Sequence, residues 1–157
     1  MVTYSYAVQK SAEMALALGH DLGISTKDSI EICSRIRGKK VGRAKVMLES
    51  AVNLETPIKY TRFSEGASHK PGMGMGKYPV KASRAILALV KSAEANAQIK
   101  GLGKDLMVAH ALAQKGAKSP KYGRHLRRSA KRTHVEIGLV PVKKIEKKEI
   151  TKKETKA

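Results

Sequence analysis

The chain has 157 residues and a mass of 17.1 kDa, which is the size of one domain. Its 32 Lys and Arg against 13 Asp and Glu give a net charge of +19, an excess typical of proteins that bind a polyanion. No apolar run reaches the roughly 18 residues of a membrane helix, and the first ten residues lack a secretory pattern. The one cysteine, Cys33, excludes an internal disulfide and a multi-cysteine zinc site, and a reducing cytoplasm is the simplest setting.

The first third of the sequence predicts one strand and two helices. Within residues 12–19, Met14, Leu16 and Leu18 alternate with smaller residues, which favours a short strand. Ser25 is placed to cap a helix, with Asp28 as its acidic partner three residues later, and Gly38 is a natural end. A second helix is expected over residues 41–53. The side chains that should face the core are Ile30, Cys33 and Ile36 on the first helix, and Val41, Ala44, Leu48 and Ala51 on the second.

The middle of the chain changes character twice. Residues 57–79 are rich in glycine and proline, which predicts an irregular basic insertion. A third helix is expected over residues 81–98, ended by Gly101 and Gly103. Its apolar stripe consists of Ala82, Ile86, Leu89, Val90, Ala93 and Ala97.

Residues 105–140 predict a long extended β-hairpin, because two runs have a period of two. In the first run Leu106, Val108, His110 and Leu112 alternate with the intervening residues, and in the second Thr133, Val135, Ile137 and Leu139 do so. The middle has few large apolar side chains, so the base of the hairpin should join the core sheet while the far part protrudes. Residues 143–157 alternate Lys with Glu and predict a mixed-charge tail without a packed structure.

The predicted fold class is α/β of the α+β kind: three helices packed on a small three-stranded antiparallel sheet, with a long protruding β-hairpin. Residues 1–157 form a single domain, in which residues 12–104 and the strand bases make the globular part. Between Asp105 and Glu136 there are eight Lys and Arg and no Asp or Glu. A solvated basic loop is the ordinary alternative, but the charge of the whole chain favours a nucleic-acid backbone that removes the repulsion between these cations.

The motifs for other chemistry are incomplete. The glycine-rich stretch 71–77 resembles a phosphate-binding loop, but Pro71 and Tyr78 stand where that motif needs Gly and Ser or Thr. His110 and His134 would face one another across the hairpin if it turned near Tyr122, yet two histidines make a poor metal site. We expect no metal, no cofactor and no catalytic residues, so the protein should not be an enzyme.

Four segments carry a family resemblance. They are Ile24-Ser25 leading to Ile36-Arg37-Gly38-Lys39, Ser92-Ala93-Glu94-Ala95-Asn96-Ala97, Pro120-Lys121-Tyr122-Gly123-Arg124, and Lys131-Arg132-Thr133-His134. Over about residues 12–140 the chain resembles the universal large-subunit ribosomal protein twenty-two family, called seventeen in eukaryotic naming. The insertion at 57–79 departs from the bacterial form and resembles the archaeal or eukaryotic form, and the absence of Trp and of a long basic extension favours the archaeal type.

The resemblance implies a structural constituent of the large subunit in the cytoplasmic ribosome, which binds ribosomal RNA and assists assembly. It also implies that the hairpin lines the nascent peptide exit tunnel. The expected partners are large-subunit ribosomal RNA, neighbouring large-subunit ribosomal proteins and, near the hairpin tip, the nascent polypeptide; no membrane is involved. The candidate RNA-binding residues are Arg37, Lys39, Lys40, Arg43, Lys59, Arg62, Lys70, Lys77, Lys115, Lys118, Lys121, Tyr122, Arg124, Arg127, Arg128, Lys131, Arg132 and His134.

Two other functions fit parts of the same pattern. An architectural DNA-binding protein shares the basic charge, but this hairpin lacks the apolar wedge residues that such proteins insert between base pairs. An RNA-processing enzyme would need a catalytic carboxylate pair or nucleophile, for which the spacing gives no support. Comparing the affinity of the protein for duplex DNA and for ribosomal RNA over a salt series separates the first from RNA binding.

Overall fold

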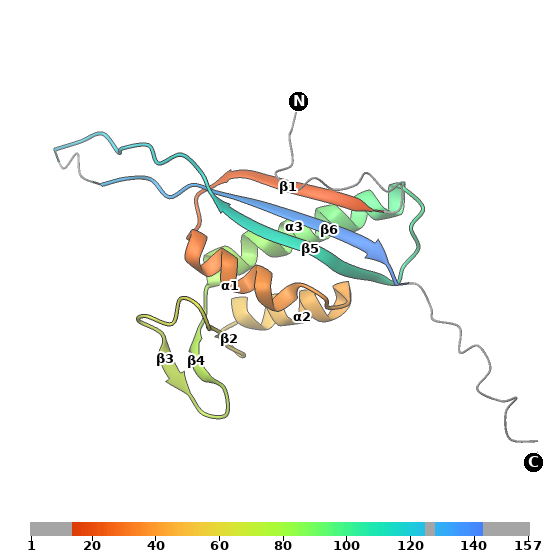
Figure 1. The fold of residues 1–157 in the computed structure, drawn as a ribbon, viewed down its shortest axis with the longest axis horizontal. Coiled ribbons are helices and arrows are strands. Elements are labelled where there is room, and N and C mark those ends of the chain that lie inside the picture. The colour runs from red at the N-terminus through yellow and green to blue at the C-terminus, as the bar shows by residue number, and fades with distance from the viewer. Residues whose placement is uncertain (1–13, 125–127, 143–157) are drawn as a thin grey trace, which may run out of the picture.

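The computed structural model describes residues 14–124 and 128–142, which form three helices and two antiparallel sheets (Figure 1). In the main sheet β6 lies between β1 and β5. The predicted α+β class, with three helices on a three-stranded antiparallel sheet, is confirmed. The bounds are β1 Ala15–Leu22, α1 Thr26–Ile36, α2 Val41–Val52, β2 Ile58–Lys59, β3 Ser68–Lys70, β4 Gly74–Lys77, α3 Val80–Ile99, β5 Leu106–Lys115 and β6 Thr133–Pro141.

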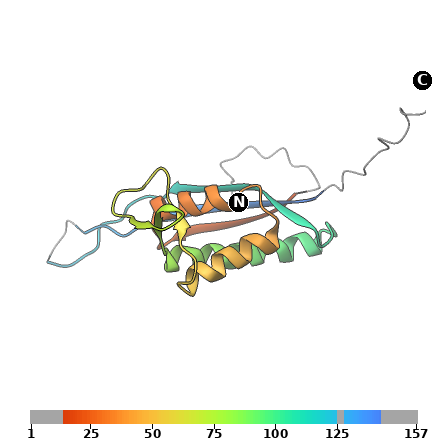
Figure 2. The same cartoon turned by 90° about the horizontal axis from the view of Figure 1, so that it is seen from below.

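The helices begin and end close to where their sequence patterns predict, but on α1 the expected core residue Ile30 is only half-buried, whereas Ile32 is fully buried. The Ser25 hydroxyl caps α1 by accepting a hydrogen bond from the Asp28 N–H at 3.4 Å, and Gly38 follows the helix with a φ of 75°. Helices α2 and α3 lie side by side, and α3 packs along β1 and β6 (Figure 2). The predicted stripes of α2 and α3 are buried except Leu89, which is half-buried. These stripes place the core between the helices and one face of the main sheet.

Strand β5 departs from the predicted alternation at a β-bulge. Val108 is opposite Leu139, but His110 is opposite Gly138, so Ala109 is an extra residue in β5. After this bulge the two faces exchange, and the core receives Ala111 and Ala113 in place of His110 and Leu112. The prediction that Leu106, Val108, His110 and Leu112 share one face is therefore wrong beyond Val108.

The composition of the insertion after α2 predicted an irregular segment, but the insertion contains a second small sheet. Strand β4 pairs with both β2 and β3, and its glycines allow a close approach: a Cβ at Gly76 would lie 3.2 Å from Lys70 Cγ. Ile58 and Tyr60 are buried and attach this sheet to the body. Strands of two to four residues carry too little alternation to be visible in the sequence.

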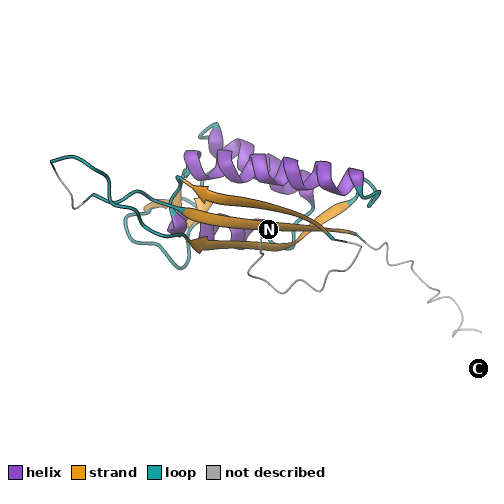
Figure 3. Ribbon diagram, turned by 90° about the horizontal axis from the view of Figure 1, so that it is seen from above, coloured by secondary structure: helices purple, strands orange, loops and turns teal. Residues whose placement is uncertain are grey.

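The β5–β6 ladder ends at Lys115 and Thr133, and the chain beyond it projects from the body (Figure 3). We call residues 116–124 and 128–132 the extension. Its two arms are joined by backbone hydrogen bonds from Gly116 N–H to Arg132 O, from Ala130 N–H to Ser119 O and from Lys121 N–H to Arg128 O. Regular strands over the whole of 105–140 are therefore not observed, since pairing in the extension is intermittent. Residues 125–127, which include Arg127, and the tail 143–157 lie outside the described residues.

None of the helices described in residues 14–124 and 128–142 is long and apolar enough to cross a membrane.

Candidate RNA interface

Basic side chains surround one end of the main sheet. The extension leaves the sheet at this end, and α1 begins beside it, because the Thr26 and Thr133 hydroxyls lie 2.8 Å apart. The second sheet attaches to the same helix through Tyr60, whose hydroxyl donates to Asp28 Oδ1 at 2.9 Å. The extension and the second sheet, far apart in sequence, are thus both attached near the start of α1.

The candidate residues of the extension are exposed to solvent. Tyr122 is fully exposed, at 100%, and is thus placed to contact a partner rather than the core. A phosphate backbone can approach this segment from any open side, since no carboxylate occurs within it. The exposed candidates here and at the end of β5 are Lys115, Lys118, Lys121, Tyr122, Arg124, Arg128, Lys131 and Arg132.

The candidates on the second sheet include three cations that lie over aromatic rings. Lys77 Nζ is 5.4 Å from the centre of the Tyr60 ring, and Lys70 Nζ is 5.3 Å from that of Tyr78. Arg62 Cζ lies 5.3 Å from the Phe63 ring centre. Lys59 is exposed, and its carbonyl oxygen accepts a hydrogen bond from Arg35 Nε at 3.1 Å. These contacts hold three of the four cations near the second sheet.

Arg37, Lys39, Lys40 and Arg43 lie at the other end of the main sheet. Gly38 N–H donates to Val108 O at 2.8 Å and Val108 N–H donates to Lys39 O at 2.9 Å, so the α1–α2 turn pairs with the start of β5. The extension begins at the far end of β5, about 23 Å away at the usual rise per residue. Arg37 donates from Nη2 to the Ala111 carbonyl, which gives it a structural role. The structure therefore divides the predicted residues into two groups.

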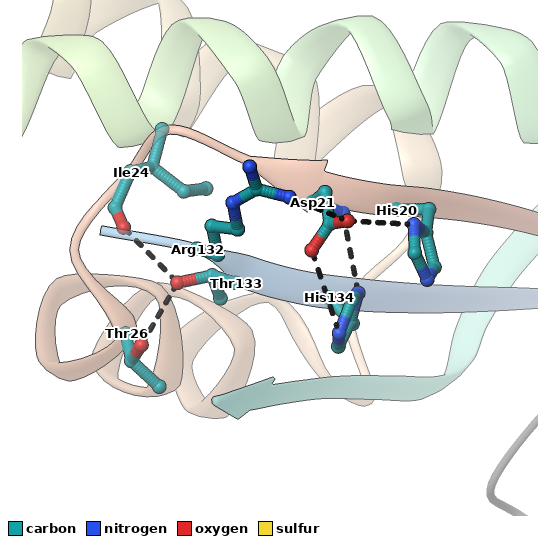
Figure 4. Close-up of polar contacts among 7 residues, drawn as sticks. All are labelled: His20, Asp21, Ile24, Thr26, Arg132, Thr133 and His134. Carbon is teal, nitrogen blue, oxygen red and sulfur yellow. Dashed lines mark hydrogen bonds and ion pairs between the residues drawn. The ribbon is translucent and has the colours of Figure 1, made fainter. Parts of the chain in front are cut away.

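Asp21 holds the root of the extension together (Figure 4). Its Oδ2 lies 3.2 Å from Arg132 Nη1 and 3.3 Å from His20 Nδ1, and its Oδ1 lies 3.8 Å from His134 Nε2. The backbone N–H of Asp21 donates to His134 Nδ1 at 3.2 Å. Asp21 thus supplies a negative charge where the two positively charged arms leave the sheet.

His20, Asp21 and His134 also bring three candidate metal ligands within 4.8 Å of one another. The hydrogen bonds do not fit a metal site. His134 Nδ1 accepts from a backbone N–H, so the neutral ring carries its proton on Nε2, the nitrogen that faces the carboxylate. A metal ion would need that nitrogen unprotonated and would lie beside the Arg132 guanidinium. We therefore interpret the cluster as a hydrogen-bonded ion pair.

The prediction that His110 and His134 face one another is wrong. Because of the register, His110 is opposite Gly138 and His134 is opposite Gln114. His110 Nε2 lies instead 3.6 Å from a Glu136 carboxylate oxygen on the neighbouring strand.

Thr133 fixes the start of β6 beneath the extension. Its side chain is fully buried, and its hydroxyl donates to the Ile24 carbonyl at 3.0 Å (Figure 4). The Thr26 hydroxyl adds a second contact. The arm that returns from the extension is therefore attached to the loop between β1 and α1 as well as to its neighbouring strands.

Glu31 attaches the loop after β2 to α1. Glu31 is buried, with 1% of the residue exposed, and its carboxylate accepts hydrogen bonds from the backbone N–H groups of Thr61, Arg62 and Phe63, the last two at 2.7 Å. Burial would raise the pKa of Glu31, but these backbone hydrogen bonds and that of the Thr61 hydroxyl outweigh it and lower the pKa from its ordinary value. The ionised carboxylate thus organises the backbone that carries Arg62.

Comparison with known proteins identifies the family. The family model for ribosomal protein L22p/L17e matches residues 17–139. The large ribosomal subunit protein uL22 of Staphylothermus marinus is 38% identical over an alignment of 146 residues, which covers 85% of this chain and 93% of the relative. That of Archaeoglobus fulgidus is 37% identical over an alignment of 125 residues, which covers 77% of this chain and 81% of the relative. The chain belongs to the ribosomal protein L22p/L17e family.

As an L22p/L17e protein the chain has a structural, non-enzymatic role in the ribosome. The family match confirms the resemblance given by the sequence motifs, and it runs from β1 through the extension to β6.

The two carboxylates that organise the interface, Asp21 and Glu31, were not among the residues predicted from the sequence. Asp21 carried no signal, because its partner Arg132 is 111 positions away. Glu31 had a weak sequence signal, because it is a charged residue directly before Ile32 and Cys33, which are both buried in the structure. Lys27 was also omitted, although it points over the Phe63 ring at 5.7 Å.

Proposed function

We propose that this L22p/L17e protein is a constituent of the large ribosomal subunit that binds ribosomal RNA through the extension and the second sheet. The relatives from Staphylothermus marinus and Archaeoglobus fulgidus carry the name large ribosomal subunit protein uL22. The observation that carries the proposal is the projecting extension, whose residues 116–124 and 128–132 include six Lys and Arg and no Asp or Glu.

Electrostatics supports RNA as the partner of the extension. Six cations on the two described arms repel one another, and Asp21 at the root neutralises only a part of this charge. A phosphate backbone around the arms removes the repulsion and releases counterions, which favours binding strongly at low salt. Because the arms are already joined by backbone hydrogen bonds, binding should cost less conformational entropy than it would for an unpaired segment.

The finer parts of the proposal are those that the family resemblance implies. In the cytoplasmic ribosome the extension would line the nascent peptide exit tunnel, with its tip near Tyr122 facing the nascent polypeptide. The body would contact neighbouring large-subunit proteins and further RNA, the latter through Arg37, Lys39, Lys40 and Arg43 at the far end. Binding at both ends of the sheet would let the protein bridge RNA domains and assist assembly.

A charge-reversal experiment tests the RNA-binding role. The variant Lys121→Glu/Arg128→Glu changes the extension where its arms are joined, and Arg84→Glu/Lys104→Glu is a control with the same charge change on exposed residues elsewhere. Each is titrated with large-subunit ribosomal RNA over a salt series. We expect the extension variant to lower the salt slope by about two, one per lost phosphate contact, and to reduce incorporation into subunits. Equal slopes and equal incorporation for the two variants would contradict the proposal.

Two further arms complete the experiment. Lys40→Glu/Arg43→Glu asks whether the opposite end of the sheet contributes its own phosphate contacts, with a second fall in slope expected. Duplex DNA in place of ribosomal RNA distinguishes the architectural DNA-binding alternative, which predicts equal affinity for the two nucleic acids.

A further inference from the structure

A cavity of about 560 Å³ opens between the start of α1 and the loop after β2. This volume is within the range of sites that hold small molecules, and it exceeds what a bound phosphate needs. The residues that give it chemical character are Lys27, Asp28, Arg62, Phe63, Glu65 and Lys77. The cavity lies on the side of the molecule where we propose that RNA binds, and none of the family motifs noted in the sequence includes Phe63.

Phe63 is the only aromatic side chain in the lining, and its position is fixed from behind. Its N–H donates to Glu31 Oε1 at 2.7 Å, and its ring is half-buried against the core. Since Glu31 also holds the two preceding residues, the backbone that carries the ring is constrained. An aromatic ring held in this way is a surface on which a nucleic-acid base can stack.

Two cations lie over the ring, and a third lines the same cavity. Lys27 Nζ lies 5.7 Å and Arg62 Cζ 5.3 Å from its centre, and Lys77 lines the same cavity while donating to the Glu65 carbonyl at 3.1 Å. Arg62 and Lys27 are both exposed, so their side chains can turn from the ring toward a phosphate. The combination of one aromatic platform and nearby cations matches the base and the phosphate of a single nucleotide.

Two carboxylates in the lining indicate a site for a whole nucleotide rather than for a phosphate alone. Asp28 and Glu65 line the cavity, and Asp28 Oδ1 already accepts from the Tyr60 hydroxyl. Carboxylates repel a phosphate, but they accept hydrogen bonds from the amino and imino groups on a base edge. A site with cations, carboxylates and an aromatic ring can therefore bind both parts of a nucleotide.

We propose that this cavity binds one unstacked nucleotide of ribosomal RNA, with its base on the Phe63 ring and its phosphate near Lys27 and Arg62. The proposal rests on the RNA-binding function proposed above, and it adds a specific subsite to what is otherwise backbone recognition by charge. It also gives the second sheet a role, because the sheet supplies Lys77 and positions the loop that carries Arg62 and Phe63.

The chain contains no Trp, so a single introduced Trp reports its own surroundings. Phe63→Trp places the fluorophore in the cavity, and Val46→Trp places it on α2 at a residue that is 65% exposed and absent from the cavity lining. Both full-length variants are titrated with a transcript of large-subunit ribosomal RNA, while filter binding follows complex formation independently. We expect the emission of F63W to fall by at least half at saturation, and that of V46W to change little.

A second variant tests the subsite without placing a Trp side chain in the cavity. Phe63→Leu retains an apolar side chain against the core but removes the ring, and we expect it to weaken RNA binding about tenfold, the effect of one lost base stack. Unquenched emission from an F63W protein that binds the RNA, together with wild-type affinity for F63L, would overturn this inference alone. Absence of RNA binding by the unaltered protein would overturn the proposed function and the subsite with it.

Discussion

Arg132 Nη1 lies 3.2 Å from Asp21 Oδ2 at the root of the extension. The two residues meet because the β1–β6 register shifts between Gly19 and Leu22, and Asp21 adopts a φ of 50° in this irregular stretch. Asp tolerates such a backbone better than most residues. The irregularity therefore has a consequence beyond the strand: it places a carboxylate beside the returning arm of a strongly basic segment.

Replacing Asp21 with Asn should loosen the root of the extension without unfolding the body. The side chains of Arg132 and Asp21 are 43% and 34% exposed, so solvent screens their attraction and the loss of stability should stay below about 1 kcal/mol. Local opening should be more sensitive, and we expect faster hydrogen exchange at the Gly116 amide, which donates to the Arg132 carbonyl.

The matched control for this variant is Glu49→Gln, which removes the exposed Glu49–Lys91 ion pair on the helical side of the molecule. Exchange at Gly116 should be unchanged in the control. The difference between D21N and the unaltered protein should also shrink in 1 M salt, where exposed charges are screened within about 3 Å. Equal exchange at Gly116 in all three proteins would show that the ion pair does not hold the root.

Cys33 should be chemically inert while the protein is folded. Burial raises the pKa of its thiol to about 12, and only 1% of the residue is exposed, so the reactive thiolate is scarce and inaccessible at neutral pH. The reaction with a disulfide reagent should accelerate by at least 100-fold in 6 M guanidinium. For comparison, Ser34→Cys in a Cys33→Ala background places a thiol on the exposed adjacent residue, which should react at once under native conditions. Comparable native rates for the two proteins would contradict the burial.

The periodic parts of the fold could be predicted because burial is encoded locally. In α2 the four residues expected at the core are all buried, and the Ser25 cap and Gly38 end of α1 were visible as single residues with known preferences. The bulge at Ala109 could not be predicted, since the apolar alternation continues through it in the sequence. One inserted residue exchanges the two faces of a strand. The strand itself was therefore predicted correctly, but the face that His110 and Leu112 occupy was not.

The interface was predicted in composition but not in arrangement. Counting charges located the extension and the basic group around Arg37, but it could not show how far apart they lie, which the length of β5 determines. The contacts of Asp21 and Glu31 join residues 111 and 30–32 positions apart, and they depend on tertiary packing that no local pattern contains.

Gly116 should tolerate no side chain. A Cβ there would lie 2.9 Å from His134 Nε2 and 3.2 Å from Asp21 Oδ1, so Gly116→Ala must displace the cluster at the root of the extension. We expect a loss of about 1–3 kcal/mol in unfolding free energy and a weaker Asp21–Arg132 pair. In contrast, Gly42→Ala in α2 meets nothing within 4 Å and should stabilise the protein by about 0.5–1 kcal/mol. Urea unfolding of both variants checks the opposite signs, and a neutral G116A would show that the cluster can shift freely.

Glu31→Gln should destabilise the protein by about 2–4 kcal/mol at pH 7, because it removes a buried charge that three backbone N–H groups and a hydroxyl solvate. The pKa of Glu31 is lower in the folded than in the unfolded chain, so its contribution is complete above the unfolded value near 4.5 and is lost as pH falls through the folded value. The difference between E31Q and the unaltered protein should therefore be largest at neutral pH and should shrink as the pH falls below about 4.5.

Glu55→Gln is the control for this pH dependence, since Glu55 is an exposed residue of the α2–β2 loop. Its unfolding curve should follow that of the unaltered protein at every pH. Loosening of the loop that carries Arg62 and Phe63 should accompany the loss of stability in E31Q, and it is measured as faster exchange of the amides that Glu31 accepts from. A stability difference that stayed constant from pH 7 to pH 3 would mean that the ionised form of Glu31 is not what holds this loop.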